Sequence, residues 1–210
     1  MIANIGTRFR EIIDTDKVSM KIDIVGAGTT GSNLVLLLAR LGLQDITVYD
    51  FDDVEDHNLG HQMYRVKDIG KPKLEALKDL VKEATDVDIK IVHGETDGKN
   101  IDTDILVLAL DTMSGRKEIV ENARHSFVVD SRIGGEVLMV YATMDKARHK
   151  ATLYSDEEAA PETCGSRSIG YTAFMVAALM EIVIKKIMLG EEFPFEQEFC
   201  AKNLIYNVKY

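Results

Sequence analysis

A short apolar run, a glycine-rich turn, a helical run and a second apolar run follow one another early in the chain, and this order restricts the fold more than any other feature. The first apolar run covers residues 20–25, the turn residues 26–32 and the helical run residues 33–41. The second apolar run, residues 46–49, ends at Asp50. A strand, turn, helix and strand closed by an acid are typical of a nucleotide-binding βαβ unit.

The residues of this turn suit a phosphate ligand. Gly26 permits a tight reversal out of the strand, Gly28 lets a phosphate approach bare backbone, and Gly31 allows the helix to pack closely on the sheet. The helix N-terminus near Ser32 offers unpaired N–H groups to an anion. Asp50 is placed to accept hydrogen bonds from ribose hydroxyls. The alternative for the glycines is a turn with a structural role only.

The apolar periodicity predicts an α/β fold, a Rossmann-like doubly wound sheet that is mostly parallel and is extended by antiparallel strands. It predicts one domain over residues 1–210 with a short N-terminal helix. Expected helices cover residues 9–14, 33–41, about 72–84, 114–124 and 168–189. Expected strands cover residues 20–25, 46–49, 87–92, 104–110, 127–130, 136–143, 149–154 and 203–209, with 136–143 and 149–154 paired antiparallel.

Composition excludes some classes of function. Thirty-five acidic against twenty-five basic residues give a net charge of −10, which argues against a broad nucleic-acid or anionic-membrane surface. The apolar stretch 169–189 contains Glu181, Lys185 and Lys186, so we do not expect it to span a membrane. Two cysteines and no signal peptide indicate a reducing, cytoplasmic setting, and the absence of paired Cys-x-x-Cys motifs argues against structural zinc.

The residues after Asp50 indicate which nucleotide chemistry to expect. Residues 50–54 read Asp-Phe-Asp-Asp-Val, residues 58–62 read Asn-Leu-Gly-His-Gln, and residues 70–73 read Gly-Lys-Pro-Lys. Residues 111–116 form an Asp-x-x-x-x-Arg pattern. Together these segments resemble the adenylyltransferases of the ThiF/MoeB and ubiquitin-activating-enzyme superfamily, and the resemblance covers most of residues 1–190. It implies ATP and Mg²⁺ as cofactors and, as partner, a small ubiquitin-like or sulfur-carrier protein with a Gly-Gly C-terminus.

The resemblance also implies roles for individual residues. Asp52 would lie near the magnesium and phosphates, Asn58 would turn its amide towards the phosphates, and Lys73 would neutralise phosphate charge. Asp111 would be the magnesium ligand, because a hard cation that bridges phosphates needs carboxylate oxygen. Arg116 would orient Asp111 or its loop, or form a structural ion pair.

His61 departs from the family pattern, which has arginine at this position. Histidine is shorter, is only partly charged at neutral pH and cannot make a bidentate phosphate contact. Arg65 could supply the missing charge, or His61 could act as a weaker donor.

Two further residues have roles only through the resemblance. Arg8 matches an N-terminal arginine that, in family homodimers, reaches the partner's ATP; a solvated surface arginine is the alternative. Cys164, in a loop ahead of the long helix, would accept an acyl group or a persulfide, and a small structural loop residue is the alternative. His93, His125 and His149 show no metal-ligand spacing and are interpreted as surface or packing residues.

The expected function is therefore Mg-ATP-dependent adenylation of a carrier's C-terminal carboxylate. The glycine turn and Asp50 alone would also permit an NAD-dependent oxidoreductase, although such an enzyme has no use for the motifs in residues 51–73. A catalytically inactive nucleotide-binding partner subunit is the third hypothesis. It is suggested by His61, which stands where the family pattern has arginine.

Overall fold

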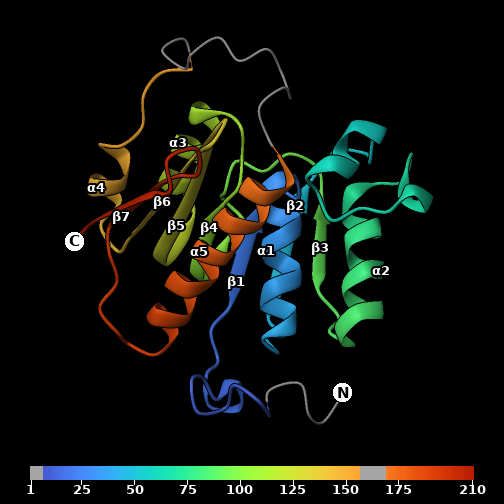
Figure 1. Ribbon diagram of the computed structural model, residues 1–210, viewed down its shortest axis with the longest axis horizontal. Helices are drawn as coiled ribbons and strands as arrows, with labels where there is room; N and C mark the ends of the chain where they lie inside the picture. Colours follow the sequence, from blue (N-terminus) through green and yellow to red (C-terminus); the bar gives the residue numbers. More distant parts are fainter. Residues whose placement is uncertain (1–6, 157–168) are drawn as a thin grey trace.

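Eight strands form one mixed sheet in residues 7–156 and 169–210, the part of the chain that the computed structural model describes (Figure 1). The strand order is β3-β2-β1-β4-β5-β6-β7-β8. β3 to β5 are parallel, whereas β6, β7 and β8 are antiparallel to their neighbours. The strands are β1 Ile22–Val25, β2 Ile46–Asp50, β3 Lys90–His93, β4 Asp102–Leu108, β5 Arg124–Gly134, β6 Val137–Thr143, β7 Glu196–Cys200 and β8 Ile205–Lys209.

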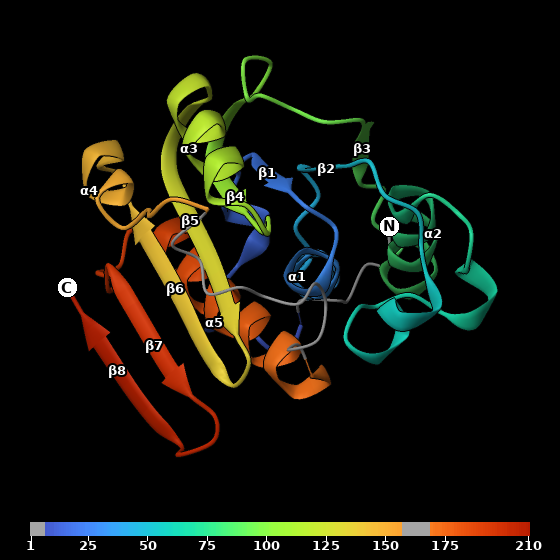
Figure 2. The same ribbon diagram turned by 90° about the horizontal axis from the view of Figure 1, so that it is seen from above.

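Helices cover both faces of this sheet. α1, α2 and α5 pack together on one face, and α3 and α4 lie on the other (Figure 2). The helices are α1 Thr29–Arg40, α2 Lys73–Thr85, α3 Met113–Asn122, α4 Lys146–Lys150 and α5 Gly170–Met188, with short 3-10 turns at Thr15–Lys17, Asp56–Gly60 and Val66–Asp68. The predicted doubly wound α/β fold with antiparallel additions is confirmed.

Each face of the sheet has its own apolar core. The larger core joins β1 and β2 to α1 and α5 through side chains such as Ile24, Leu34 and Met180. The smaller one lies under α3, where Ile119 packs against Leu106. All four residues of β1 are buried, as expected for the centre of a parallel sheet. Its one polar side chain, Asp23, accepts a hydrogen bond from the Tyr49 hydroxyl at 2.8 Å.

The strand order reverses direction between β1 and β4. The chain continues from β1 through α1 to β2 and β3, and then crosses back to β4 on the other side of β1. The helices that follow β1 and β4 therefore leave the sheet towards opposite faces, and open α/β sheets bind ligands at the carboxyl ends of the strands at such a point. We call this end of the parallel strands, marked by Val25, Asp50 and Leu108, the carboxyl edge.

Three sequence predictions were wrong. Residues 149–154, expected as a strand, fall in α4 and the segment behind it, because Asp145 caps a helix by accepting hydrogen bonds from the amides of Ala147 and Arg148. β6 pairs antiparallel with β5 and β7 instead. β7 was not predicted, and residues 9–14 form turns rather than a helix.

The charges of the long helix α5 argue against a membrane span, and part of the helix packs in the protein core. Its buried residues include Val176, Met180 and Val183, which pack in the larger core. Among the described residues, no helix is both long enough and apolar enough to cross a membrane.

Candidate nucleotide site at the carboxyl edge

The glycine turn brings α1 unusually close to the sheet. Gly26 has φ +100°, and a Cβ there would lie 2.4 Å from the carbonyl oxygen of Ala109, just beyond β4. A Cβ on Gly31 would lie 1.8 Å from the carbonyl oxygen of Gly26. Only glycine fits at either position. A Cβ on Gly28 would instead meet only the Gln62 amide nitrogen, at 4.0 Å, so the backbone of Gly28 is open to a ligand.

Asp50 is tied to this turn at the end of β2. Its Oδ2 accepts a hydrogen bond from the Ala27 amide at 2.6 Å, and its Oδ1 accepts one from the Asp52 amide at 2.8 Å. Both carboxylate oxygens are therefore fixed by backbone, and each keeps lone pairs for a further donor. The side chain is only partly buried, so a ligand at the carboxyl edge can reach it.

Ser32, expected near the phosphates at the helix N-terminus, is held within the protein. Its side chain is fully buried, and its hydroxyl donates to the Gly28 carbonyl oxygen at 2.7 Å. The Ser32 amide donates to the same oxygen, and the Met63 amide donates to the Ser32 hydroxyl. α1 begins at Thr29, so the amides of its first turn, ahead of Ser32, are the ones that lie at the helix N-terminus.

The loop after β2 is attached to the same helix N-terminus. The Tyr64 hydroxyl donates to the Ala27 carbonyl oxygen at 2.6 Å, and the Asn33 side chain donates to the His61 carbonyl oxygen at 3.1 Å. These contacts place the Asn-Leu-x-His-Gln motif beside the glycine turn. The bridging roles of Tyr64 and Asn33 have no motif or spacing in the sequence that predicts them.

Asn58 is buried within the 3-10 turn Asp56–Gly60. Its Oδ1 accepts a hydrogen bond from the Glu55 amide at 2.8 Å, which closes a capping box. The side-chain oxygen thus accepts a hydrogen bond within the loop, and the side-chain NH₂ group remains as a donor for a ligand.

Lys73 begins α2 and forms an ion pair with Asp52. Its Nζ lies 2.7 Å from Asp52 Oδ2, and the lysine side chain is 8% exposed while the aspartate side chain is 49% exposed. The Lys73 amide also donates to the Asp52 carbonyl oxygen at 2.9 Å. Two residues that the sequence placed separately near the phosphates are therefore in contact, and a phosphate would compete with Asp52 for the ammonium group.

His61 is half-buried near this ion pair. Burial, followed by the nearby His57 and Lys73, lowers the pKa of His61 below its ordinary value, which favours the neutral ring. Arg65 already has partners, because its guanidinium binds Asp68 at 2.8 Å and also pairs with Glu83. Its hydrogen bond to Asp68 raises the pKa of Arg65 further. A role for Arg65 in supplying charge to the nucleotide stays a prediction.

Asp111 follows β4 in the link to α3. Ala109 donates its amide to the Val25 carbonyl oxygen at 2.9 Å, which brings the link against the glycine turn. The Asp111 side chain is exposed and has no hydrogen bond or ion pair within the described residues. Arg116 is buried, pairs with Asp130 and donates to the Leu110 carbonyl oxygen. It therefore forms an ion pair and also holds the loop of Asp111.

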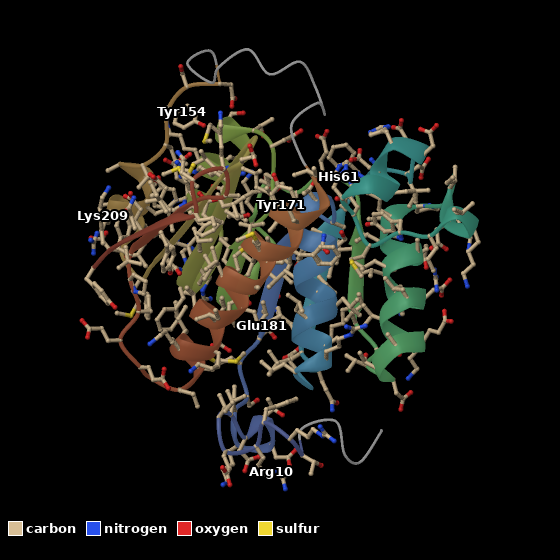
Figure 3. The ribbon with its side chains drawn as sticks, viewed as in Figure 1. Arg10, His61, Tyr154, Tyr171, Glu181 and Lys209 are labelled. Atoms are coloured by element: carbon tan, nitrogen blue, oxygen red, sulfur yellow. The ribbon has the colours of Figure 1, made fainter. Side chains whose placement is uncertain are left out.

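Arg8 lies apart from this constellation in the described structure. The turn of residues 7–12 that contains Arg8 lies beyond the amino ends of the strands, and Figure 3 places the neighbouring Arg10 at the end of the molecule opposite to His61. Arg8 is exposed, so its reach into a partner's site stays a prediction. Cys164 lies outside the described residues, and its role stays a prediction as well.

Other polar groups in the described part of the chain do not form a competing site. The described residues contain no group of three or more histidine, cysteine, aspartate or glutamate side chains that could hold a metal ion by themselves. A polar hollow of about 470 Å³ lies at the amino ends of β4 and β5, where it includes Lys21, Asp102 and Lys146. Lys21 and Lys146 already donate to main-chain carbonyl oxygens there.

Curated relatives match parts of this chain. The catalytic subunit of the NEDD8-activating enzyme E1 of Arabidopsis thaliana is 35% identical over 106 residues, which are 48% of this chain and 23% of that protein. The SAMP-activating enzyme E1 of Haloferax volcanii is 31% identical over 106 residues, 47% of this chain and 39% of that protein. The chain thus spans well under half the length of these relatives.

Solved structures show the same fold. E. coli MccB, in a crystal structure with AMPCPP and MccA, has a TM-score of 0.75 at 16% identity and covers 99% of this chain and 71% of its own. PaaA has a TM-score of 0.69 at 18% identity, over 90% of this chain and 63% of its own. The model of the ThiF family matches residues 2–209. The chain therefore belongs to the ThiF family.

Proposed function

We propose that this chain is an ATP- and magnesium-dependent adenylyltransferase that activates the C-terminal carboxylate of a small ubiquitin-like or sulfur-carrier protein. The observation that carries the proposal is the open glycine turn at the carboxyl edge, with Asp50 fixed on it and Lys73 beginning the next helix. Membership of the ThiF family and relatives named as activating enzymes support the same class of reaction.

The proposed ATP lies across the turn. Its phosphates approach Gly28 and the first turn of α1, where unpaired amides and the helix dipole favour an anion. The ribose hydroxyls donate to the carboxylate of Asp50. Lys73 exchanges part of its contact with Asp52 for a phosphate oxygen, and the amide group of Asn58 faces the same phosphates.

The donor set of this edge fits magnesium. Mg²⁺ keeps several waters and is bound by one or two carboxylates together with substrate phosphates, so it does not need a cluster of protein ligands. Asp111 offers an exposed carboxylate without a partner among the described residues, and Asp52 is a second carboxylate close to Lys73. When bound, the ion would neutralise triphosphate charge and polarise the α-phosphate.

In the proposed reaction, an oxygen of the carrier's C-terminal carboxylate attacks the α-phosphorus of ATP. The bond from this phosphorus to the bridging oxygen of the β-phosphate breaks, and pyrophosphate leaves with that electron pair. The products are an acyl-adenylate and pyrophosphate, and no proton has to be moved. The chain contributes alignment of the reactants and the positive charge of Lys73 and the α1 N-terminus.

The proposal includes the later steps and the assembly. The carrier ends in Gly-Gly. The thiolate of Cys164 attacks the acyl carbon of the adenylate and AMP leaves, which gives a thioester; alternatively the thiolate takes the outer sulfur of a donor persulfide and the donor leaves as a thiolate. The active unit is a homodimer in which Arg8 reaches the partner's ATP.

The test is ATP–pyrophosphate exchange by the purified protein with Mg²⁺, with and without carriers that end in Gly-Gly. We expect exchange that depends on the carrier and stops with a chelator. Asp111→Ala should abolish exchange and leave the thermal unfolding midpoint within the range of an exposed Asp79→Ala control. Exchange at the wild-type rate by Asp111→Ala would refute the assignment of Asp111, and binding of NAD in preference to ATP would favour an oxidoreductase.

A catalytically inactive nucleotide-binding subunit is the second candidate, because the neutral His61 carries no charge to the phosphates. It predicts ATP binding without exchange for every carrier tested. His61→Arg should then create exchange, since arginine is charged at every relevant pH and can contact two phosphate oxygens. If wild-type protein already shows carrier-dependent exchange, this candidate fails.

A further inference from the structure

The link that carries Asp111 is held by side chains at both of its ends. Arg116 donates to the Leu110 carbonyl oxygen on one side of Asp111. On the other side, the carboxylate of Asp156 accepts the amide of Met113 at 2.6 Å and the amide of Ser114 at 3.2 Å. Leu110 and Met113 are therefore fixed, while the side chain of Asp111 between them stays exposed.

Asp156 caps α3 in place of the residue at the helix's own N-cap position. Thr112 occupies the N-cap position but makes no side-chain capping hydrogen bond. Hydrogen bonds from Ser114 and Met113 lower the pKa of Asp156, so its carboxylate is charged at neutral pH. A negative charge at a helix N-terminus is favourable, and here it comes from a residue 43 positions along the chain.

One buried cluster anchors both ends of the link. Asp130 is fully buried and binds Arg116, Arg132 and the Nε2 of His149. Burial alone would raise the pKa of Asp130, but Arg116, His149 and Arg132 together hold it below its ordinary value. Arg116 is thereby fixed in the orientation in which its second nitrogen reaches Leu110.

The same cluster also positions the segment before Asp156. The two terminal nitrogens of Arg132 donate to the carbonyl and hydroxyl oxygens of Thr152, each at 2.7 Å. Arg132 lies over the ring of Tyr154 as well, with 6.0 Å from guanidinium carbon to ring centroid. Thr152 and Tyr154 lead directly to Asp156, so the cap and the Arg116 contact share Asp130 as a common anchor.

We propose that Asp156 and Arg116 are positioning residues that preset the carboxylate of Asp111 for a nucleotide-bound divalent cation. The inference rests on the proposed function, because it takes Asp111 as the ligand of that cation. The link starts at Ala109, which lies against Gly26 of the glycine turn. Small shifts of the link therefore move Asp111 relative to the phosphates of the proposed nucleotide. Groups that orient a metal ligand typically change metal affinity about 10- to 100-fold when they are removed.

The experiment measures, by titration calorimetry, binding of the preformed Mn²⁺–ATP complex to the protein and, separately, binding of ATP in the presence of a chelator. Asp156→Ala should weaken binding of the complex about tenfold and leave the affinity for metal-free ATP unchanged. Asp156→Asn keeps one acceptor for the two amides, so we expect a smaller loss. Amide hydrogen exchange in residues 110–114 should be faster in Asp156→Ala than in the wild type.

Asp79→Ala is the control. Asp79 is also an exposed aspartate, but it lies on α2, on the face of the sheet opposite to α3 and its cap. We expect its Mn²⁺–ATP binding to equal that of the wild type. The thermal unfolding midpoint of each variant establishes that it is folded. If Asp156→Ala does not fold, the Mn²⁺–ATP affinity is measured on Asp156→Asn instead.

Two results would overturn the inference. One is wild-type Mn²⁺–ATP affinity in folded Asp156 variants, and the other is an equal loss of metal-free ATP binding. Failure of the proposed function looks different: the wild type would bind Mn²⁺–ATP with the predicted dependence on Asp156 but show no exchange with any carrier. A wild-type protein that does not bind Mn²⁺–ATP at all would refute the inference as well.

Discussion

The buried cluster around Asp130 contains two guanidinium groups and one carboxylate, and this imbalance predicts which of its residues is hardest to replace. Asp130 is 0% exposed, Arg116 3% and Arg132 9%. Asp130→Asn would leave both arginines buried without a counter-charge. Arg116→Met would leave Asp130 with Arg132 at 2.9 Å and His149 at 3.0 Å, and would remove the excess positive charge.

The expected costs differ accordingly. Loss of one partner from a buried ion pair typically costs about 3–5 kcal/mol, and we expect Asp130→Asn in this range. Arg116→Met loses hydrogen bonds to Asp130 and to the Leu110 carbonyl, but relief of the excess charge offsets part of this, so we expect about 2 kcal/mol. For a chain of this size, 1 kcal/mol shifts the unfolding midpoint by about 2–4 °C.

The assay is urea unfolding at pH 7, supported by thermal midpoints. Asp79→Asn and Arg40→Met, two exposed helical positions, are the controls and should each change the free energy of unfolding by less than about 1 kcal/mol. A loss for Arg116→Met that equals or exceeds the loss for Asp130→Asn would refute the reasoning, since charge imbalance would then not decide the cost.

The remaining predictions concern the glycine turn and two histidines. Gly31→Ala should cost more than about 3 kcal/mol in the free energy of unfolding, because its Cβ would lie 1.8 Å from the Gly26 carbonyl oxygen. Gly28→Ala should change the free energy of unfolding by less than about 1 kcal/mol but weaken ATP binding measured by calorimetry. Unchanged ATP binding by the folded variant would contradict the proposed phosphate position. Burial and then Lys146 lower the pKa of His125 from 6.5 to about 4, so the unfolded chain binds the extra proton first, and stability should fall as the pH drops from 6.5 to 4. His125→Phe should reduce this fall by about 1–3 kcal/mol in urea titrations at both pH values, and an unchanged fall would exclude a neutral buried ring. His61→Gln should keep exchange at pH 7.5 within about twofold of the wild type, since the neutral ring has no charge to lose; a large loss would show that the imidazole acts directly.

Much of the nucleotide half could be predicted because its determinants are close together in the sequence. β1, the glycine turn and α1 are consecutive, and both the periodicity and the positive φ of Gly26 are local properties. α2, expected at about 72–84, is observed at Lys73–Thr85. The alignment of Asp50 with the turn also followed from spacing, since β1 and β2 pair in parallel register.

The antiparallel half was harder to predict because its strands depend on their neighbours. β7 has charged Glu196 and Glu198 in alternation with Gln197 and Phe199, and it became a strand by pairing with β6 and β8. The helix α4 was not predicted although Asp145 is a usual N-cap residue, because its five residues, Lys-Ala-Arg-His-Lys, are too few and too polar to show a helical apolar period.

The sequence by itself determined the ThiF-type motifs, the parallel α/β core and the candidate ligands Asp50, Lys73 and Asp111. Only the tertiary structure decided which of these residues are free and which are already in contact. It paired Lys73 with Asp52, buried Ser32 and joined Asp156 to the N-terminus of α3. The physical reason is that strand and helix signals act over a few residues, whereas hydrogen bonds and ion pairs join side chains that only the packed sheet brings together.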